Sequence, residues 1–187
     1  LVFYLQVDEK REPDTGKIKT TKTLIFPRYH QLAATRLLLA QTKQQGTGHN
    51  YLIQHSAGSG KTNTISWSAH EVNQPVFNSV IVVSDRRNLD KQLQDSIYQI
   101  EHKLGVVEKI DEDKSSADLA NALNTGVKII ITTLQKFSFI LDKVQNLSDK
   151  RFAVIVDEAH SSQGGRSASN LRVVLGQHTD EQALAAA

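Results

Sequence analysis

A chain of 187 residues is long enough for one domain with a sizeable core. Its 22 basic and 20 acidic residues nearly cancel, so any nucleic-acid contact must come from local patches rather than from a general basic surface. The absence of cysteine excludes disulfides and thiolate metal sites, and no apolar run approaches the roughly 20 residues that a membrane helix needs. We therefore expect a soluble, cytoplasmic protein.

The first 22 residues differ in composition from the rest of the chain. The stretch "DEKREPDTGKIKTTK" is polar and contains one proline and one glycine, which is typical of exposed, irregular segments. We interpret residues 1–22 as a lead-in or as the tail of a preceding domain. Residues 23–187 are then expected to form one domain.

Four short hydrophobic runs predict buried strands. They are "YLIQH" at 51–55, "SVIVVS" at 79–84, "VKIIITT" at 127–133 and "FAVIVDE" at 152–158. Each is nearly continuous in apolar residues rather than alternating, a pattern typical of strands that are covered on both faces in a parallel sheet.

Helical spacing separates these runs. The first helix would carry an apolar face formed by Leu32, Ala33, Leu37 and Ala40 with Arg36 at its edge, and a second would carry Leu89, Leu93, Ile97 and Ile100. Ser115 or Ser116 could cap a third, containing Leu119, Ala122 and Leu123 and ending before Gly126. Alternating strands and helices predict a three-layer α/β/α domain with a mainly parallel sheet and right-handed crossovers.

The stretch "HSAGSGKTN" predicts a phosphate-binding loop between a strand and a helix. Glycines allow backbone N–H groups to turn inward and approach phosphate oxygens, and the following helix adds the positive end of its dipole. The lysine would reach the β- and γ-phosphates, while the threonine hydroxyl would ligate Mg²⁺. The expected nucleotide-binding residues are Gly58, Ser59, Gly60, Lys61 and Thr62.

This loop departs from the strict pattern G-x-x-x-x-G-K-[ST] at its first position. The pattern requires glycine where this chain has His55. A glycine-rich surface turn that happens to precede a lysine is the alternative interpretation, although a strand and a helix on either side favour the phosphate loop.

The stretch "VIVDEAH" places two carboxylates at the end of a predicted buried strand. Ligands bind at this edge of open α/β sheets. Asp157 could hold Mg²⁺ opposite Thr62, and Glu158 could orient and deprotonate the attacking water. Glu158 and Lys61 are therefore the expected catalytic residues. An acidic pair after a strand is, taken alone, more often a solvated turn.

The phosphate loop and the acidic pair together resemble the first RecA-like domain of superfamily-two helicases and translocases. More narrowly, five ordered segments resemble the motor region of the restriction subunit of type I restriction-modification enzymes: "TLIFPRYHQ", "YLIQHSAGSGKTNTISWSAH", "VIVVSDRRNLDKQLQD", "IIITTLQKF" and "VIVDEAHSSQGGR". The resemblance extends from about Val7 to about Leu175, and His55 lies within the wording shared with that family.

The resemblance implies roles for further residues. Gln31 would hydrogen-bond the edge of adenine, since a side-chain amide offers both a donor and an acceptor; the alternative is that Gln31 only opens a helix. Four residues after strands would contact DNA phosphates without reading sequence. These are Arg86, Arg87, Thr133 and Lys136, and ordinary solvated polar positions are the alternative for them.

The resemblance also implies ATP and Mg²⁺ as cofactors, double-stranded DNA as the track, and specificity and methyltransferase subunits as partners. A nuclease domain would precede this region and a second motor domain would follow it. That second domain would supply an arginine worth about 10³-fold or more in rate in related enzymes. We therefore expect this stretch alone to bind ATP weakly and hydrolyse it poorly.

Two other functions remain open from the sequence. One is another DNA or RNA helicase of the same superfamily. The other is a nucleotide-binding module that keeps the fold and does not hydrolyse ATP.

Overall fold

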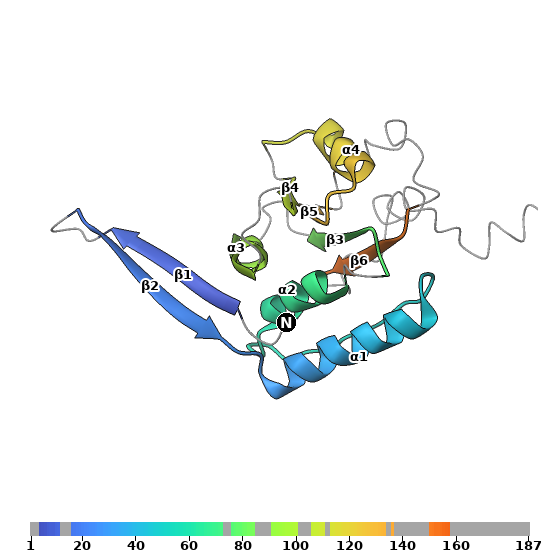
Figure 1. Cartoon of the computed structure of the whole chain (residues 1–187), viewed down its shortest axis with the longest axis horizontal. Helices are drawn as coiled ribbons and strands as arrows, with labels where there is room; N and C mark the ends of the chain where they lie inside the picture. Colours follow the sequence, from blue (N-terminus) through green and yellow to red (C-terminus); the bar gives the residue numbers. More distant parts are fainter. Residues whose placement is uncertain are drawn as a thin grey trace, which may run out of the picture.

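The computed structural model describes residues 4–11, 16–72, 76–84, 91–100, 106–110, 113–133, 136 and 150–157 (Figure 1). The elements in chain order are β1 (Tyr4–Arg11), β2 (Ile18–Ile25), α1 (Tyr29–Gln45), α2 (Lys61–Val72), β3 (Ser79–Ser84), α3 (Lys91–Ile100), β4 (Val107–Lys109), α4 (Ser116–Thr125), β5 (Ile129–Thr133) and β6 (Phe152–Val156). Within these ranges no helix has the length and apolar character needed to cross a membrane.

A four-stranded parallel sheet forms the centre of the structure, in the order β4-β5-β3-β6. Strand β3 pairs with β5 from Val80 opposite Ile129 to Ser84 opposite Thr133. Every residue of β3 and β5 is buried, whereas β6 lies at the edge of the described sheet and is half-buried. The predicted parallel strands are confirmed as β3, β5 and β6, although β6 is half-buried rather than buried and position 158 lies outside the described residues.

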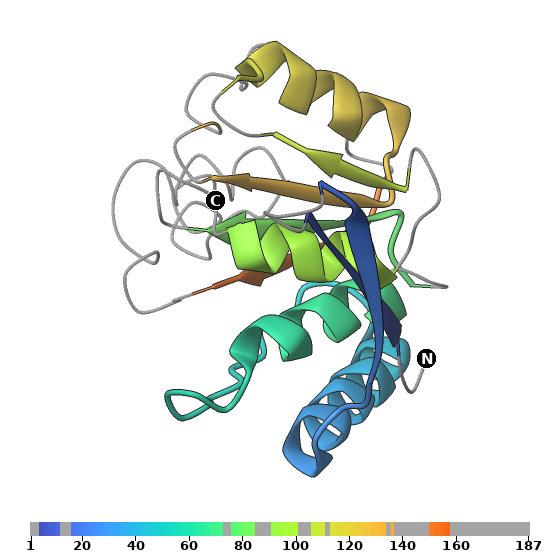
Figure 2. The same cartoon turned by 90° about the vertical axis from the view of Figure 1, so that its left-hand side faces the viewer.

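Helices cover both faces of this sheet. Alternate residues of a strand point to opposite faces, so Ile81, Val83 and Ile130 pack against α4, while Val80, Val82, Ile129 and Ile131 pack toward α2 and α3. Figure 2 shows α4 on one side of the sheet and the other two helices on the opposite side. The predicted three-layer α/β architecture is therefore confirmed.

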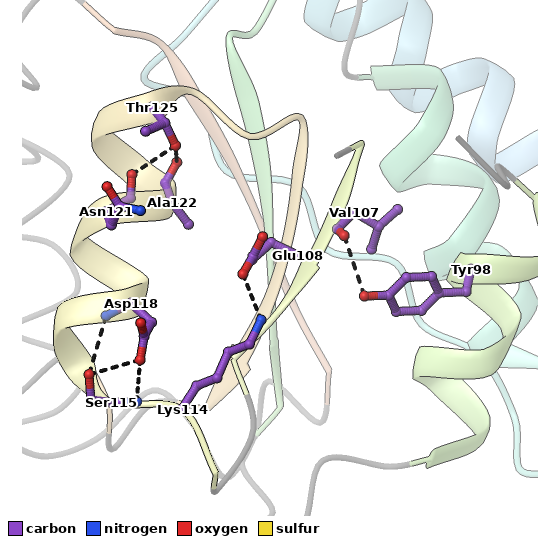
Figure 3. Close-up of polar contacts among 9 residues, drawn as sticks. All are labelled: Tyr98, Val107, Glu108, Lys114, Ser115, Asp118, Asn121, Ala122 and Thr125. Carbon is purple, nitrogen blue, oxygen red and sulfur yellow. Dashed lines mark hydrogen bonds and ion pairs between the residues drawn. The ribbon is translucent and has the colours of Figure 1, made fainter. Parts of the chain in front are cut away.

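Helix α4 begins and ends at the residues that the sequence indicated. The Ser115 hydroxyl accepts hydrogen bonds from the backbone N–H groups of Ala117 and Asp118, at 3.2 and 3.4 Å. In return, the Asp118 carboxylate accepts the Ser115 backbone N–H at 2.7 Å (Figure 3). Gly126 ends the helix in the left-handed region, at φ 74°. This capping box satisfies backbone groups that a helix cannot pair internally.

Helix α1 is present as predicted, but its predicted apolar face is not the face that is buried. Its buried residues are Gln31, Thr35 and Thr42, whereas Leu37 is 64% exposed. Thr35 and Ser68 place their hydroxyl oxygens 3.5 Å apart where α1 meets α2. A polar interface with α2 and the phosphate loop, rather than an apolar core, decides how this helix is oriented.

The strand predicted at residues 51–55 is not formed. These residues have no regular secondary structure, and Leu52 is 82% exposed. An apolar run becomes a strand only where a neighbour supplies backbone partners. In the described part of the chain, β6 pairs with β3 and residues 51–55 pair with neither strand.

Two strand regions were missed by the sequence analysis. Strands β1 and β2 form an antiparallel hairpin, with Tyr4 opposite Ile25 and Arg11 opposite Ile18, and β1 contacts α3. The described side chains of β2 are mostly exposed, so the hairpin lacks the apolar signal used for the other strands. Strand β4 has only three residues. Strand β2 crosses position 22, and the domain boundary proposed there stays a prediction.

Candidate nucleotide-binding site

The glycine loop lies directly before α2. Its two glycines both adopt positive φ, 73° at Gly58 and 84° at Gly60. A Cβ atom at Gly58 would meet nothing within 4 Å, whereas one at Gly60 would lie 2.5 Å from the Gln31 amide nitrogen. Gly60 is therefore required for two reasons, its backbone conformation and the close approach of Gln31.

Helix α2 starts at Lys61, the residue after the loop. The Gly60 carbonyl accepts backbone hydrogen bonds from Asn63 and Thr64, at 3.1 and 3.3 Å. The start of a helix carries the positive end of its dipole and favours an anion. The predicted loop–helix arrangement is present, although the strand expected before it is not.

The start of α1 holds the loop from one side. The Gln31 side chain is 2% exposed. Its Nε2 donates to the carbonyls of Ser59 and Gly60, at 3.1 and 3.0 Å. Its Oε1 accepts the backbone N–H of Arg28 at 2.8 Å. These partners fix which end of the amide is nitrogen and which is oxygen, since the nitrogen meets carbonyl acceptors and the oxygen meets an N–H donor. The adenine contact predicted for Gln31 stays a prediction, and it requires the amide to exchange a partner.

Two histidines lie beside the glycine loop, His30 on α1 and His55 at the start of the loop. The His30 Nε2 is 3.0 Å from the Ser59 carbonyl oxygen. The ring of His55 meets that of His30 edge to face, with centroids 5.4 Å apart. Partial burial lowers the pKa of the His55 imidazole, and the nearby His30 and Lys61 lower it further. The sequence analysis assigned His30 no role, although its position beside Gln31 at a helix start was visible.

Asp157 follows β6 at the carboxyl edge of the sheet. Its backbone N–H donates to the Val83 carbonyl at 3.0 Å, which continues the pairing of β6 with β3. Strand β6 and helix α2 are in contact, so the acidic motif and the helix that carries Thr62 belong to neighbouring elements. Glu158, the predicted catalytic carboxylate, lies outside the described residues.

Two of the four residues predicted to contact DNA belong to the described part of the chain. Arg86 and Arg87 lie outside the described residues. Thr133 ends β5 and is 5% exposed. Lys136 donates from its ammonium group to the Lys114 carbonyl. Thr133 is thus buried, and Lys136 is hydrogen-bonded within the protein. The contact of either residue with DNA stays a prediction.

The loop combines two features that phosphate-binding loops share, glycines at positive φ and a helix that starts directly after them. For a metal, the described residues contain no cluster of three or more His, Asp or Glu side chains. Thr62 and Asp157 together would suit Mg²⁺, which keeps several waters and phosphate oxygens and needs only one or two protein ligands.

The chain resembles known proteins over most of its length. The model of the SWI2/SNF2 ATPase family matches residues 30–180. The chain belongs to the SWI2/SNF2 ATPase family. This match includes the phosphate loop and the acidic motif, so the ATPase assignment covers both halves of the predicted site.

The curated relatives are restriction enzymes. A type I restriction enzyme endonuclease subunit of Staphylococcus aureus is 29% identical over 154 residues, and one of Staphylococcus saprophyticus is 30% identical over the same length. Each match covers 79% of this chain but only 16% of the relative. The matched region thus covers about a sixth of the length of these subunits.

A solved structure shares the fold. The UvsW helicase from bacteriophage T4 matches with a TM-score of 0.55 at 14% identity, over 82% of this chain and 50% of that protein. The expected RecA-like fold and the resemblance to the motor region of restriction subunits are confirmed by these matches.

Proposed function

We propose that this SWI2/SNF2 ATPase domain is the first motor domain of a type I restriction endonuclease subunit, and that it couples ATP hydrolysis to movement along double-stranded DNA. The observation that carries the proposal is the glycine loop at the start of α2, backed by Gln31 and His30. The names of the staphylococcal relatives support the restriction system as its setting.

The chain's own residues would divide the work of phosphoryl transfer. The loop amides and Lys61 would bind the β- and γ-phosphates, and Gln31 would contact adenine. Thr62 and Asp157 would hold Mg²⁺, which when bound neutralises charge on the phosphates. Glu158 would orient the attacking water and accept its proton.

Contact with DNA would come from the carboxyl edge of the sheet. Thr133 ends β5, and residues 85–90 follow β3, which is parallel to β5. Arg86, Arg87, Thr133 and Lys136 would contact phosphates, which are the same at every base pair and so suit movement over any sequence. Specificity and methyltransferase subunits would complete the enzyme, acting in the cytoplasm.

The test uses the assembled restriction enzyme whose subunit contains this chain. We expect ATPase activity stimulated by double-stranded DNA, together with displacement of a triplex-forming strand from the duplex. Lys61→Ala and Glu158→Gln should abolish both activities, while His49→Ala, at an exposed position before the loop, should leave them unchanged. Strand separation without triplex displacement would indicate an unwinding helicase and contradict translocation. Nucleotide binding without hydrolysis would indicate a non-hydrolysing module.

A further inference from the structure

The Ser59 carbonyl is a point of convergence in the phosphate loop. His30 and Gln31, two consecutive residues at the start of α1, both reach this oxygen, at 3.0 and 3.1 Å. Gln31 also reaches the next carbonyl, that of Gly60, at 3.0 Å. Two successive peptide groups of the loop are therefore fixed from the α1 side.

The orientation of each carbonyl also determines the orientation of the N–H group in the same peptide unit. In a planar trans peptide the C=O and the following N–H point in opposite directions. With the carbonyls of Ser59 and Gly60 held toward α1, the N–H groups of Gly60 and Lys61 point away from it. These are amides of the kind that a phosphate loop offers to its ligand.

His55 packs against His30. Its ring contacts the His30 ring edge to face, and its Nε2 is buried with no hydrogen-bond partner among the described residues. Burial, and then the nearby His30 and Lys61, lower the pKa of His55 and so favour its neutral form. A glycine at position 55, as in the strict motif, would leave the outer side of His30 without this neighbour.

We propose that His30 and His55 are positioning residues for nucleotide binding: His30 holds the Ser59 carbonyl so that the loop amides face the phosphates, and His55 supports the His30 ring. This inference rests on the proposed nucleotide-binding function. Since the contact is to the backbone of the loop, its effect is independent of the base. That separates it from the adenine contact expected of Gln31.

Isothermal titration of the 187-residue chain with MgATP and with MgGTP tests the role of His30. His30→Ala should weaken both affinities by the same factor, about 3- to 10-fold, the equivalent of one hydrogen bond. His30→Gln, which keeps a donor, should recover most of that loss. His49→Ala is the matched control, because His49 is also an exposed histidine near the loop but makes no contact with it that the structure describes.

Replacement of His55 by glycine tests whether its ring supports that of His30. His55→Gly restores the strict motif, yet it should weaken binding of both nucleotides, by about 2- to 5-fold, since the His30 ring loses its neighbour. Unfolding followed through Trp67, the one tryptophan of the chain, establishes that each variant is folded. If His30→Ala does not fold, the comparison of His30→Gln with His55→Gly carries the test.

These titrations distinguish failure of the nucleotide-binding function from failure of the positioning role of His30 and His55. No binding of MgATP by the unsubstituted chain would overturn the nucleotide-binding function, and this inference with it. Binding that is unchanged in His30→Ala, or tightened in His55→Gly, would overturn this inference alone. A loss for MgATP without an equal loss for MgGTP would also overturn it, because it would place His30 at the base.

Discussion

Helices α1 and α4 bury opposite kinds of side chain. Helix α4 places Leu119 and Leu123 in the core, with both side chains fully buried. Helix α1 buries Gln31, Thr35 and Thr42 and exposes Leu37 and Tyr29. Helix α4 therefore stabilises the sheet, whereas the buried face of α1 makes polar contacts with α2 and the phosphate loop.

The comparison predicts very different costs for the same substitution in the two helices. Leu123→Ala should lower the free energy of unfolding by about 2–5 kcal/mol, because it removes buried methyl groups and leaves a cavity. Leu37→Ala should change it by about 0.5 kcal/mol or less, since the side chain is largely exposed. Urea unfolding monitored by Trp67 fluorescence measures both. Equal losses would mean that α1 packs through its apolar residues after all.

The contact of α1 with the loop predicts that the two loop glycines are not equivalent. Alanine at either position should lower the free energy of unfolding by about 1–2 kcal/mol, because the backbone there is left-handed. Gly60→Ala should cost about 1–2 kcal/mol more than Gly58→Ala, because its Cβ displaces the Gln31 amide from two carbonyls. Urea unfolding of the two variants gives this difference directly. A larger loss for Gly58→Ala would contradict the role of Gln31 as a support of the loop.

The capping box of α4 predicts a small dependence of stability on pH. Hydrogen bonds from the Ser115 backbone and hydroxyl lower the pKa of the Asp118 carboxyl. A lowered pKa in the folded state stabilises the protein above the ordinary carboxyl pKa, roughly 4, and that stability is lost as the pH falls through the folded pKa.

Asp118→Asn should therefore reduce the acid sensitivity of unfolding below about pH 4. Asp113→Asn, at an exposed position before the helix, is the control and should leave the pH profile as it is. Thermal unfolding between neutral and acid pH measures the profiles. An unchanged profile in Asp118→Asn would mean that the capping box has no net effect on stability.

The sequence predicts well those features that depend on neighbouring residues. Strands β3 and β5 follow from continuous β-branched runs, and α4 follows from Ser115 and Gly126 at its two ends. The glycine loop follows from its spacing before α2. In each case the physical cause lies within about ten residues of the element that it specifies.

The features that the sequence does not predict depend on distant contacts. Gln31 meets the loop across 28 positions, so the polar face of α1 could not be recognised from its own periodicity. The run at 51–55 has the composition of a strand, but its pairing depends on a partner elsewhere in the chain. The second predicted carboxylate and the arginines after β3 lie outside the described residues, and their roles stay predictions.

Binding of MgATP to the 187-residue chain and to its Lys61→Ala variant shows whether the glycine loop is a nucleotide site. Titration calorimetry should give saturable binding to the unsubstituted chain, with a loss of about 2 kcal/mol or more in Lys61→Ala because one charged hydrogen bond to phosphate is removed. The folded state of the variant is checked by its unfolding curve. Binding that does not change in folded Lys61→Ala would contradict a nucleotide site at the glycine loop.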